Sequence, residues 1–258
     1  MSIKIDVTNL LHSKRMPGGI PLSNLEAAQE VCSIAHQAIM DDRLVHPLGF
    51  YELPDQDTTQ IKAFAAEARQ KFDDFVVLGI GGSALGNIAL NSALKTTRNL
   101  DKRLFVADNV DPHLLGHILS EINLERTLFN VITKSGTTAE TMSVFLIIRK
   151  LLEEKFPNDF RSRMVITTDR EKGFLRKMVN DEGYSDFVVP DNVGGRFSIF
   201  TDVGLLSSAF LGIDIDALLA GAAAMRKRCL NPAIMENPAY MMGLLSHLFM
   251  KKGYNISV

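Results

Sequence analysis

Short apolar runs alternate with segments long enough to form helices through the middle of the chain. The first run, FVVLGI (75–80), lacks alternation between apolar and polar positions, as in a strand covered on both faces of a parallel sheet. This pattern predicts an α/β fold, a doubly wound five-stranded parallel sheet of the flavodoxin-like kind. The predicted strands are 75–80, 104–107, 127–133, 164–168 and 186–190. The predicted helices cover about 58–71, a segment from Ser83, a segment from Asp111 and Pro112, about 138–155 and about 170–182.

A helical arm is predicted to precede the sheet. Ser23 and Glu26 match the S-x-x-E capping box, and apolar residues then recur at helical spacing. The prediction is a single helix from about Asn24 to Arg43. The polar stretch that follows it, which contains two prolines, indicates an extended linker. We therefore expect residues 1–57 to form an N-terminal arm and linker.

The pattern changes after Asp191, where helices follow one another without strands between them. The final YNISV looks like the start of another strand, so we expect the chain to stop shortly after a new unit begins. The expected domains are 58–212 for the α/β domain and 213–258 for a helical connection and the start of a second domain. The predicted helices lie at about 205–211, after a cap at Asp214 or Asp216, after Asn231 and Pro232, and after Asn237 and Pro238.

Composition and charge narrow the classes of function. The formal net charge of -2 argues against a nucleic-acid-binding protein, which carries a basic excess. No apolar run is long enough for a membrane span and no secretory leader is evident, so we expect no membrane partner. Cys32 and Cys229 form no CxxC pattern, which fits a reducing cytoplasm. His113 and His117 have helical metal-ligand spacing without an evident third ligand, so no metal site is predicted.

A glycine-rich corner follows the first predicted strand. Gly79, Gly81 and Ala84 satisfy the dinucleotide fingerprint G-x-G-x-x-G/A, and Asp108 ends the next strand where a ribose ligand would lie. A helix start with unpaired N–H groups favours an anion, and Ser83 adds a hydroxyl. The corner alone leaves two alternatives open, a nucleotide site and a purely structural turn.

A second segment combines hydroxyls, a lysine and a glycine at the start of a predicted helix. An ordinary helix cap would explain one hydroxyl but not four, and the segment does not match the Walker pattern. Hydroxyls and backbone N–H groups at a helix start can surround the oxygens of a phosphate. The candidate binding residues are Thr133, Lys134, Ser135, Thr137 and Thr138.

A third segment, DNVGGRFS (191–198), places Arg196 between two glycines and an aromatic residue. The guanidinium group is always protonated and has a planar set of donors, so it suits an oxyanion that develops during a reaction. The alternative is a structural arginine that ties the loop to a carboxylate.

Taken together, GIGGSALG, TKSGTTAET and DNVGGRFSIFTDVG resemble the glucose-6-phosphate isomerase family in its bacterial form, and more broadly the sugar isomerase (SIS) domain superfamily. The resemblance covers most of the chain. It implies that Gly82 and Ser83 contact the sugar of a hexose 6-phosphate and that Arg196 lies beside the enediolate. The phosphate contacts that it implies are Thr133, Lys134, Ser135 and Thr138. Asp202 departs from the family pattern, which has a small residue there.

The resemblance also implies a reaction, the interconversion of glucose 6-phosphate and fructose 6-phosphate without metal or organic cofactor. The family's catalytic glutamate, histidine and lysine would lie beyond Val258, so we expect this chain alone to be inactive. A homodimer is implied for the full-length protein. Two other hypotheses stay open at this point: a non-catalytic sugar-phosphate sensor with a SIS domain, and an NAD(P)-dependent dehydrogenase, which would leave the hydroxyl segment unused.

Overall fold

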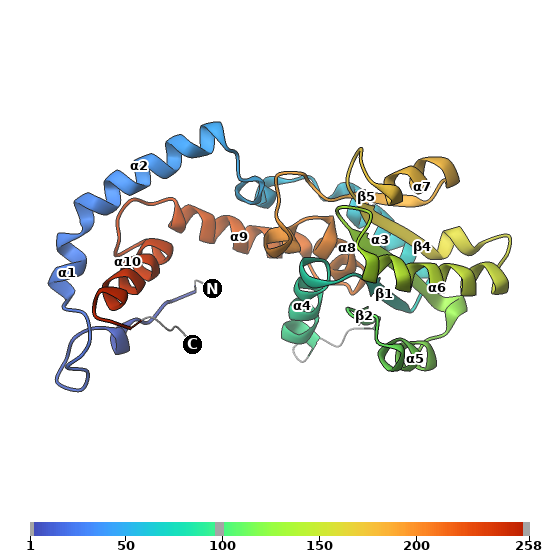
Figure 1. Cartoon of the computed structure of the whole chain (residues 1–258), viewed down its shortest axis with the longest axis horizontal. Coiled ribbons are helices and arrows are strands. Elements are labelled where there is room, and N and C mark those ends of the chain that lie inside the picture. Colours follow the sequence, from blue (N-terminus) through green and yellow to red (C-terminus); the bar gives the residue numbers. More distant parts are fainter. Residues whose placement is uncertain (1–2, 96–100, 255–258) are drawn as a thin grey trace. The chain divides into compact units, whose positions relative to one another are not determined.

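A computed structural model of the chain describes residues 3–95 and 101–254 (Figure 1). It divides into two compact units. One unit comprises Leu48–Ala220, and the other comprises Met1–Pro47 together with Gly221–Val258. The α/β unit therefore begins ten residues before the predicted boundary at 58 and extends beyond the predicted boundary at 212. The segment 48–57, predicted as linker, belongs to the α/β unit.

The described part of the α/β unit contains a parallel sheet of five strands in the order β2-β1-β3-β4-β5. This is the flavodoxin-like order of a doubly wound sheet, and it confirms the predicted fold class. The strands are β1 Asp74–Leu78, β2 Arg103–Ala107, β3 Thr127–Thr133, β4 Met164–Thr168 and β5 Ser185–Val188.

Helices cover both faces of this sheet, which explains why β1 is apolar without alternation. Phe75 and Val77 pack into one core cluster with α3 and α8, whereas Val76 and Leu78 pack into the other with α5, α6 and α7. Every residue of β1 is buried. The α-helices that lie wholly within this unit are α3 Thr59–Lys71, α4 Leu85–Lys95, α5 Pro112–Glu121, α6 Ala139–Lys155, α7 Phe174–Glu182 and α8 Asp202–Phe210.

The strand order places a crevice at the carboxyl ends of β1 and β3. The chain leaves β1 for β2 on one side and later returns to β3 on the other side, so the connections after β1 and β3 diverge there. Both connections begin at this edge, one after Leu78 and the other after Thr133. The glycine corner and the hydroxyl segment are these two connections.

Three predicted helix caps are present. Asp111 Oδ1 accepts hydrogen bonds from the backbone N–H groups of His113 and Leu114, at 2.7 and 3.2 Å. Asn237 caps α10 (Pro238–Lys251) in the same way. Of the two candidates for α9 (Ile215–Cys229), Asp214 accepts from the backbone of the third helical residue at 2.9 Å, whereas Asp216 accepts from Thr58.

The prediction of one helix from Asn24 to Arg43 was wrong. Two helices, α1 (Leu22–Ala27) and α2 (Gln29–Val45), meet at Ala28, whose ψ of -3° is a turn conformation. The expected capping box is absent because Pro21 occupies the cap position of α1, which leaves Ser23 inside the helix.

Other predicted helix starts were also displaced by local turns. The helix predicted from Ser83 begins at Leu85, because residues 81–83 form a 3-10 turn first. The helix predicted from about 170 begins at Phe174, because the Asp169 carboxylate accepts the N–H groups of the next turn.

The helix predicted after Asn231 was wrong, because the Asn231 side chain accepts from the N–H of Ala233 and shapes a turn instead. The small-residue helix predicted around 205–211 is α8, which starts earlier because Thr201 caps it. The strand predicted at YNISV covers residues 254–258, of which 255–258 lie outside the described residues.

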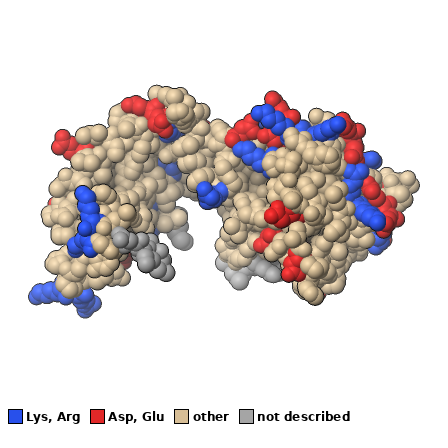
Figure 2. Space-filling view, viewed as in Figure 1, with Lys and Arg blue, Asp and Glu red and all other residues tan. Residues whose placement is uncertain are grey.

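The other unit has a small core of its own, formed by α1, α10 and the segments beside them. Its buried apolar residues are Ile20, Leu25, Ile234, Met241 and Leu245. Among the described residues of the whole chain, no helix combines the length and apolar character needed to cross a bilayer. On the face shown in Figure 2, the Lys and Arg side chains of the α/β unit lie among Asp and Glu side chains.

Candidate functional site

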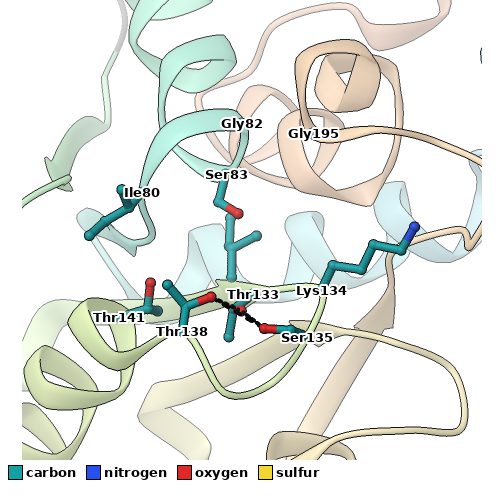
Figure 3. Close-up of a pocket in the computed structure, with 10 residues that line it drawn as sticks. Ile80, Gly82, Ser83, Thr133, Lys134, Ser135, Thr138, Thr141 and Gly195 are labelled. Carbon is teal, nitrogen blue, oxygen red and sulfur yellow. Dashed lines mark hydrogen bonds between the residues drawn. The ribbon is translucent and has the colours of Figure 1, made fainter.

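A pocket with a volume of about 300 Å³ lies at the carboxyl edge of the sheet, between the connections that follow β1 and β3 (Figure 3). The two predicted segments thus face a common space, as a doubly wound sheet requires at its switch point. The lining residues are Ile80, Gly82, Ser83, Ile132, Thr133, Lys134, Ser135, Thr138, Thr141 and Gly195.

Glycines shape the wall that follows β1. Gly81 has a φ of +57°, the left-handed region that favours glycine. A Cβ on Gly79 would lie 2.8 Å from the Cβ of Ser83, so the turn closes tightly only because that position has no side chain. The closed turn presents the Ser83 hydroxyl to the pocket (Figure 3).

Hydroxyls form the wall that follows β3. Thr133 is buried at the end of the strand, and its Oγ1 lies 2.9 Å from Thr138 Oγ1 and 3.4 Å from Ser135 Oγ. Thr138 precedes the first residue of α6, but its hydroxyl does not cap that helix. The hydroxyls therefore cluster beside a helix start whose N–H groups have no intrahelical partner. Such an arrangement offers donors and a positive dipole end to an anion.

The third predicted segment reaches the pocket through Gly195. A Cβ on Gly82 would overlap the main chain of Gly195, so these two backbones are in direct contact. Ser198 Oγ strengthens this contact by donating to the carbonyl oxygens of Gly82, at 3.0 Å, and Gly195, at 2.8 Å. The segment after β1 and the segment that carries the arginine are thus joined.

Comparison with known proteins identifies the family of the chain. The family model described as phosphoglucose isomerase matches residues 57–255. The chain belongs to the phosphoglucose isomerase family. Glucose-6-phosphate isomerase of Carboxydothermus hydrogenoformans is 40% identical over 269 residues, covering 100% of this chain and 58% of that protein. The enzyme of the same name from Rubrobacter xylanophilus is also 40% identical, covering 99% of this chain and 60% of that protein.

The fold of the chain is similar to that of two solved structures. A glucose-6-phosphate isomerase from Chlamydia trachomatis has a TM-score of 0.76 and 26% identity, covering 91% of this chain and 50% of that one. A hypothetical protein from Thermus thermophilus has a TM-score of 0.80 and 35% identity, covering 88% of this chain and 54% of that one. The chain thus spans between half and three fifths of the length of these relatives.

The structure brings most, but not all, of the predicted site residues of this phosphoglucose isomerase family member together. Gly82, Ser83, Thr133, Lys134, Ser135 and Thr138 line the pocket. Thr137 is exposed and does not line it, although its backbone N–H donates to Ser135 Oγ at 3.2 Å. Arg196 directly follows Gly195 but is exposed and does not line the pocket. Its predicted role beside an enediolate stays a prediction.

Lys134 lines the pocket, yet its ammonium group is engaged elsewhere. Nζ donates to the main-chain carbonyl oxygens of Asp191, at 2.6 Å, and Val193, at 3.4 Å. In Figure 3 the side chain extends away from the hydroxyls of Thr133, Ser135 and Thr138. The contact joins the connection after β3 to the segment that carries Arg196.

Sequence reasoning missed a few members of the site. Ile80 and Ile132 were assigned to strands and line the pocket at the strand ends. Thr141 is buried and lies three residues after Thr138, one helical turn along α6. That spacing was the available signal, because residues i and i+3 lie on one face of a helix. Asp108, the ribose ligand of the dehydrogenase hypothesis, is not among the described lining residues.

Asp202, the residue that departs from the family pattern, follows the third segment in the sequence and begins α8. Burial raises the pKa of its carboxyl group. The backbone N–H of Val188 donates to Oδ2 at 3.0 Å, and this hydrogen bond partly offsets the increase in pKa. Asp202 therefore ties the end of β5 to the start of α8. Among the described residues, no group of three or more His, Cys, Asp or Glu side chains could hold a metal ion.

Proposed function

We propose that this chain is the sugar-phosphate-binding part of a glucose-6-phosphate isomerase. The hydroxyls of Thr133, Ser135 and Thr138 and the N–H groups at the start of α6 hold the 6-phosphate of a hexose 6-phosphate. Gly82 and Ser83 lie against the sugar. The observation that supports this most directly is that both segments line one pocket at the carboxyl edge of the sheet.

In this proposal Arg196 stabilises the negative charge of the cis-enediolate that forms when a proton moves between C2 and C1. A permanently charged guanidinium group can stabilise such an oxyanion, and the flexible side chain begins one residue from the pocket. The reaction requires no metal or organic cofactor. The full-length protein acts in the cytoplasm as a homodimer.

Proton transfer at carbon needs a base, and none lines the pocket. The described lining residues include no carboxylate and no imidazole. A general base must come within hydrogen-bonding distance of the proton that it removes. We therefore propose that this chain alone binds sugar phosphate but does not isomerise it.

Calorimetric titration tests the binding part of the proposal. The chain is titrated separately with 6-phosphogluconate, whose carboxylate resembles part of the enediolate, and with NAD. We expect saturable binding of 6-phosphogluconate and none of NAD. Binding of NAD alone would support a dehydrogenase instead, and binding of neither would reject the proposed site.

Turnover measurements test the catalytic part. The 258-residue chain should not convert fructose 6-phosphate to glucose 6-phosphate, and robust conversion would contradict the proposal. In the full-length protein, Arg196→Met should lower kcat by roughly a hundredfold or more while KM changes little. An unchanged kcat would remove Arg196 from the reaction.

A further inference from the structure

The ammonium group of Lys134 lies in the site but contacts protein rather than open pocket. We propose that Lys134 is a positioning residue that holds the segment 191–195 in place, and that it is not a direct ligand of the phosphate. This inference rests on the proposed function, because it concerns how the same site is organised.

The contacts of the ammonium group support the proposal that Lys134 is a positioning residue. Nζ lies 2.6 Å from the carbonyl oxygen of Asp191 and 3.4 Å from that of Val193. A hydrogen bond from a cation to a carbonyl oxygen is stronger than one between neutral groups. The bonds direct the charge toward the main chain of the third segment and away from the hydroxyls of Thr133 and Thr138, as Figure 3 shows for the side chain.

The segment that receives these bonds has few regular contacts of its own. Residues 189–194 form no helix or strand, and the 3-10 turn that contains Arg196 begins at Gly195. Val193 is buried and its backbone N–H donates to Pro190 O at 3.2 Å. The two bonds from Lys134 Nζ therefore add side-chain contacts to the few backbone bonds of this segment.

Two other contacts brace the third segment (191–198) from other directions. The backbone N–H of Gly49 donates to Asn192 O at 3.1 Å, and the ring of Phe50 stacks on Phe197 at a centroid distance of 4.8 Å. Lys134 adds a brace from the connection after β3, which also carries the hydroxyl cluster. Lys134 thus links the phosphate end of the pocket to the loop on which Arg196 is carried.

Hydrogen exchange of the ligand-free chain tests the contact without relying on substrate. The backbone N–H groups of Val193 and Phe197 are hydrogen-bonded and serve as probes. In Lys134→Met, we expect their exchange to accelerate by roughly tenfold, since a charge-assisted hydrogen bond is lost. Lys134→Arg, which keeps a long cationic donor, should restore at least half of the protection. Lys177→Met, on the exposed side of α7, is the matched control and should leave exchange unchanged.

Titration with two ligands then separates positioning from direct binding. Inorganic phosphate probes the hydroxyl cluster alone, whereas 6-phosphogluconate also reaches toward the arginine segment. Lys134→Met should weaken 6-phosphogluconate binding by roughly tenfold. The affinity for inorganic phosphate should change by less than about threefold, because an ammonium group that points away from the hydroxyl cluster, in surroundings of high dielectric, contributes little to phosphate binding.

Two results would overturn the inference. One is wild-type exchange at Val193 and Phe197 in Lys134→Met, and the other is an equal loss of affinity for both ligands, which would make the ammonium group a phosphate ligand. If wild-type protein binds neither ligand, the proposed function fails, but the exchange experiment still decides whether Lys134 holds the segment.

Discussion

Gly82 and Gly195 lie in direct main-chain contact, although one follows β1 and the other follows β5. A Cβ on Gly82 would overlap the carbonyl group of Gly195, and Ser198 Oγ donates to the carbonyl oxygens of both residues. Because both glycines line the pocket, this contact fixes one of its walls. Main chain cannot move aside as a flexible side chain can, so a larger residue at position 82 must separate the two segments.

Gly82→Ala should therefore destabilise the α/β unit by about 1–3 kcal/mol and weaken 6-phosphogluconate binding by roughly tenfold or more. Urea unfolding and calorimetric titration measure the two effects. Gly116→Ala is the control: Gly116 lies inside α5 with open space around it, so alanine there should stabilise the protein by about 0.5–1 kcal/mol. Unchanged stability and binding in Gly82→Ala would show that the segments are not in contact.

A second prediction concerns the hydroxyl cluster formed by Thr133, Ser135 and Thr138. Thr133→Val keeps the shape of a buried side chain and removes only the hydroxyl that lies 2.9 Å from Thr138 Oγ1. If that hydroxyl binds phosphate, affinity for inorganic phosphate should fall by roughly tenfold, because hydrogen bonds to charged groups contribute about 1.5–3 kcal/mol. Calorimetry measures the change, and urea unfolding checks that the fold is retained.

Thr137→Val is the matched control for that experiment. Thr137 belongs to the same segment but is exposed and does not line the pocket, and its Oγ1 makes a long hydrogen bond to Ser135 Oγ, at 3.3 Å. Its substitution should leave phosphate affinity within about twofold of wild type. An equal loss in both variants would mean that the segment contributes its shape, and not a specific hydroxyl, to binding.

The sheet could be predicted from the sequence because its three central strands, β1, β3 and β4, are buried on both faces. β3 and β4 have the predicted bounds, 127–133 and 164–168, since in both cases an apolar run extended by buried threonines fills the strand. Helix starts were less predictable. At α7, the Asp169 carboxylate and Gly173, with a φ of +95°, build a turn that helical periodicity does not reveal.

The site also has one part that the sequence predicted and one part that it did not. The residue types of the hydroxyl segment and its place after β3 predicted a phosphate-sized cluster. The contacts of Lys134 with Asp191 and of Gly82 with Gly195 could not be predicted, because they depend on which connections the strand order brings together. From the sequence, the lysine beside four hydroxyls was interpreted as a phosphate ligand, and that interpretation stays a prediction.

The turn after β4 predicts a pH dependence of stability. Asp169 accepts hydrogen bonds from the N–H groups of Glu171 and Lys172, each at 2.8 Å, which lowers the pKa of its carboxyl group to about 2. Its ordinary pKa is 3.8, so the folded state binds the proton less readily than the unfolded state. The resulting stabilisation is fully present above about pH 4 and is lost as the pH falls toward about 2.

Urea unfolding at a series of pH values from about 5 to 2 measures this effect. In Asp169→Asn, the amide oxygen can still accept the two hydrogen bonds, but it does not titrate. The stability of this variant should therefore fall less steeply with acidification than that of wild type. Equal slopes for the two proteins would show that Asp169 does not carry the dependence. Asp73 also has a lowered pKa, because of its bonds to Arg126 and Lys102, so a residual slope is expected.

The buried amide of Asn87 supports the turn that contains Ser83. Asn87 is 1% exposed, and its Nδ2 donates to the carbonyl oxygens of Ser83, at 2.9 Å, and Val203, at 3.1 Å. Ser207 Oγ donates to its Oδ1. The amide thus joins α4 and the turn before it to α8, and its bonds to Val203 and Ser207 are buried.

Asn87→Leu keeps the side-chain volume approximately but removes the donor to two carbonyl oxygens and the acceptor of Ser207 Oγ, which keeps only its contact with Gly204 O at 3.1 Å. The substitution should therefore cost about 3 kcal/mol of stability. The Ser83 turn should also lose its support, which weakens 6-phosphogluconate binding. Asn91→Leu, one turn further along α4 and not fully buried, should change stability by less than about 0.5 kcal/mol. Combining Asn87→Leu with Ser207→Ala also removes the hydroxyl that has lost its amide acceptor, so the double variant should be more stable than the sum of the two single losses predicts. Strict additivity in urea unfolding would mean that Asn87 and Ser207 do not interact, and that the turn is held by its glycines alone.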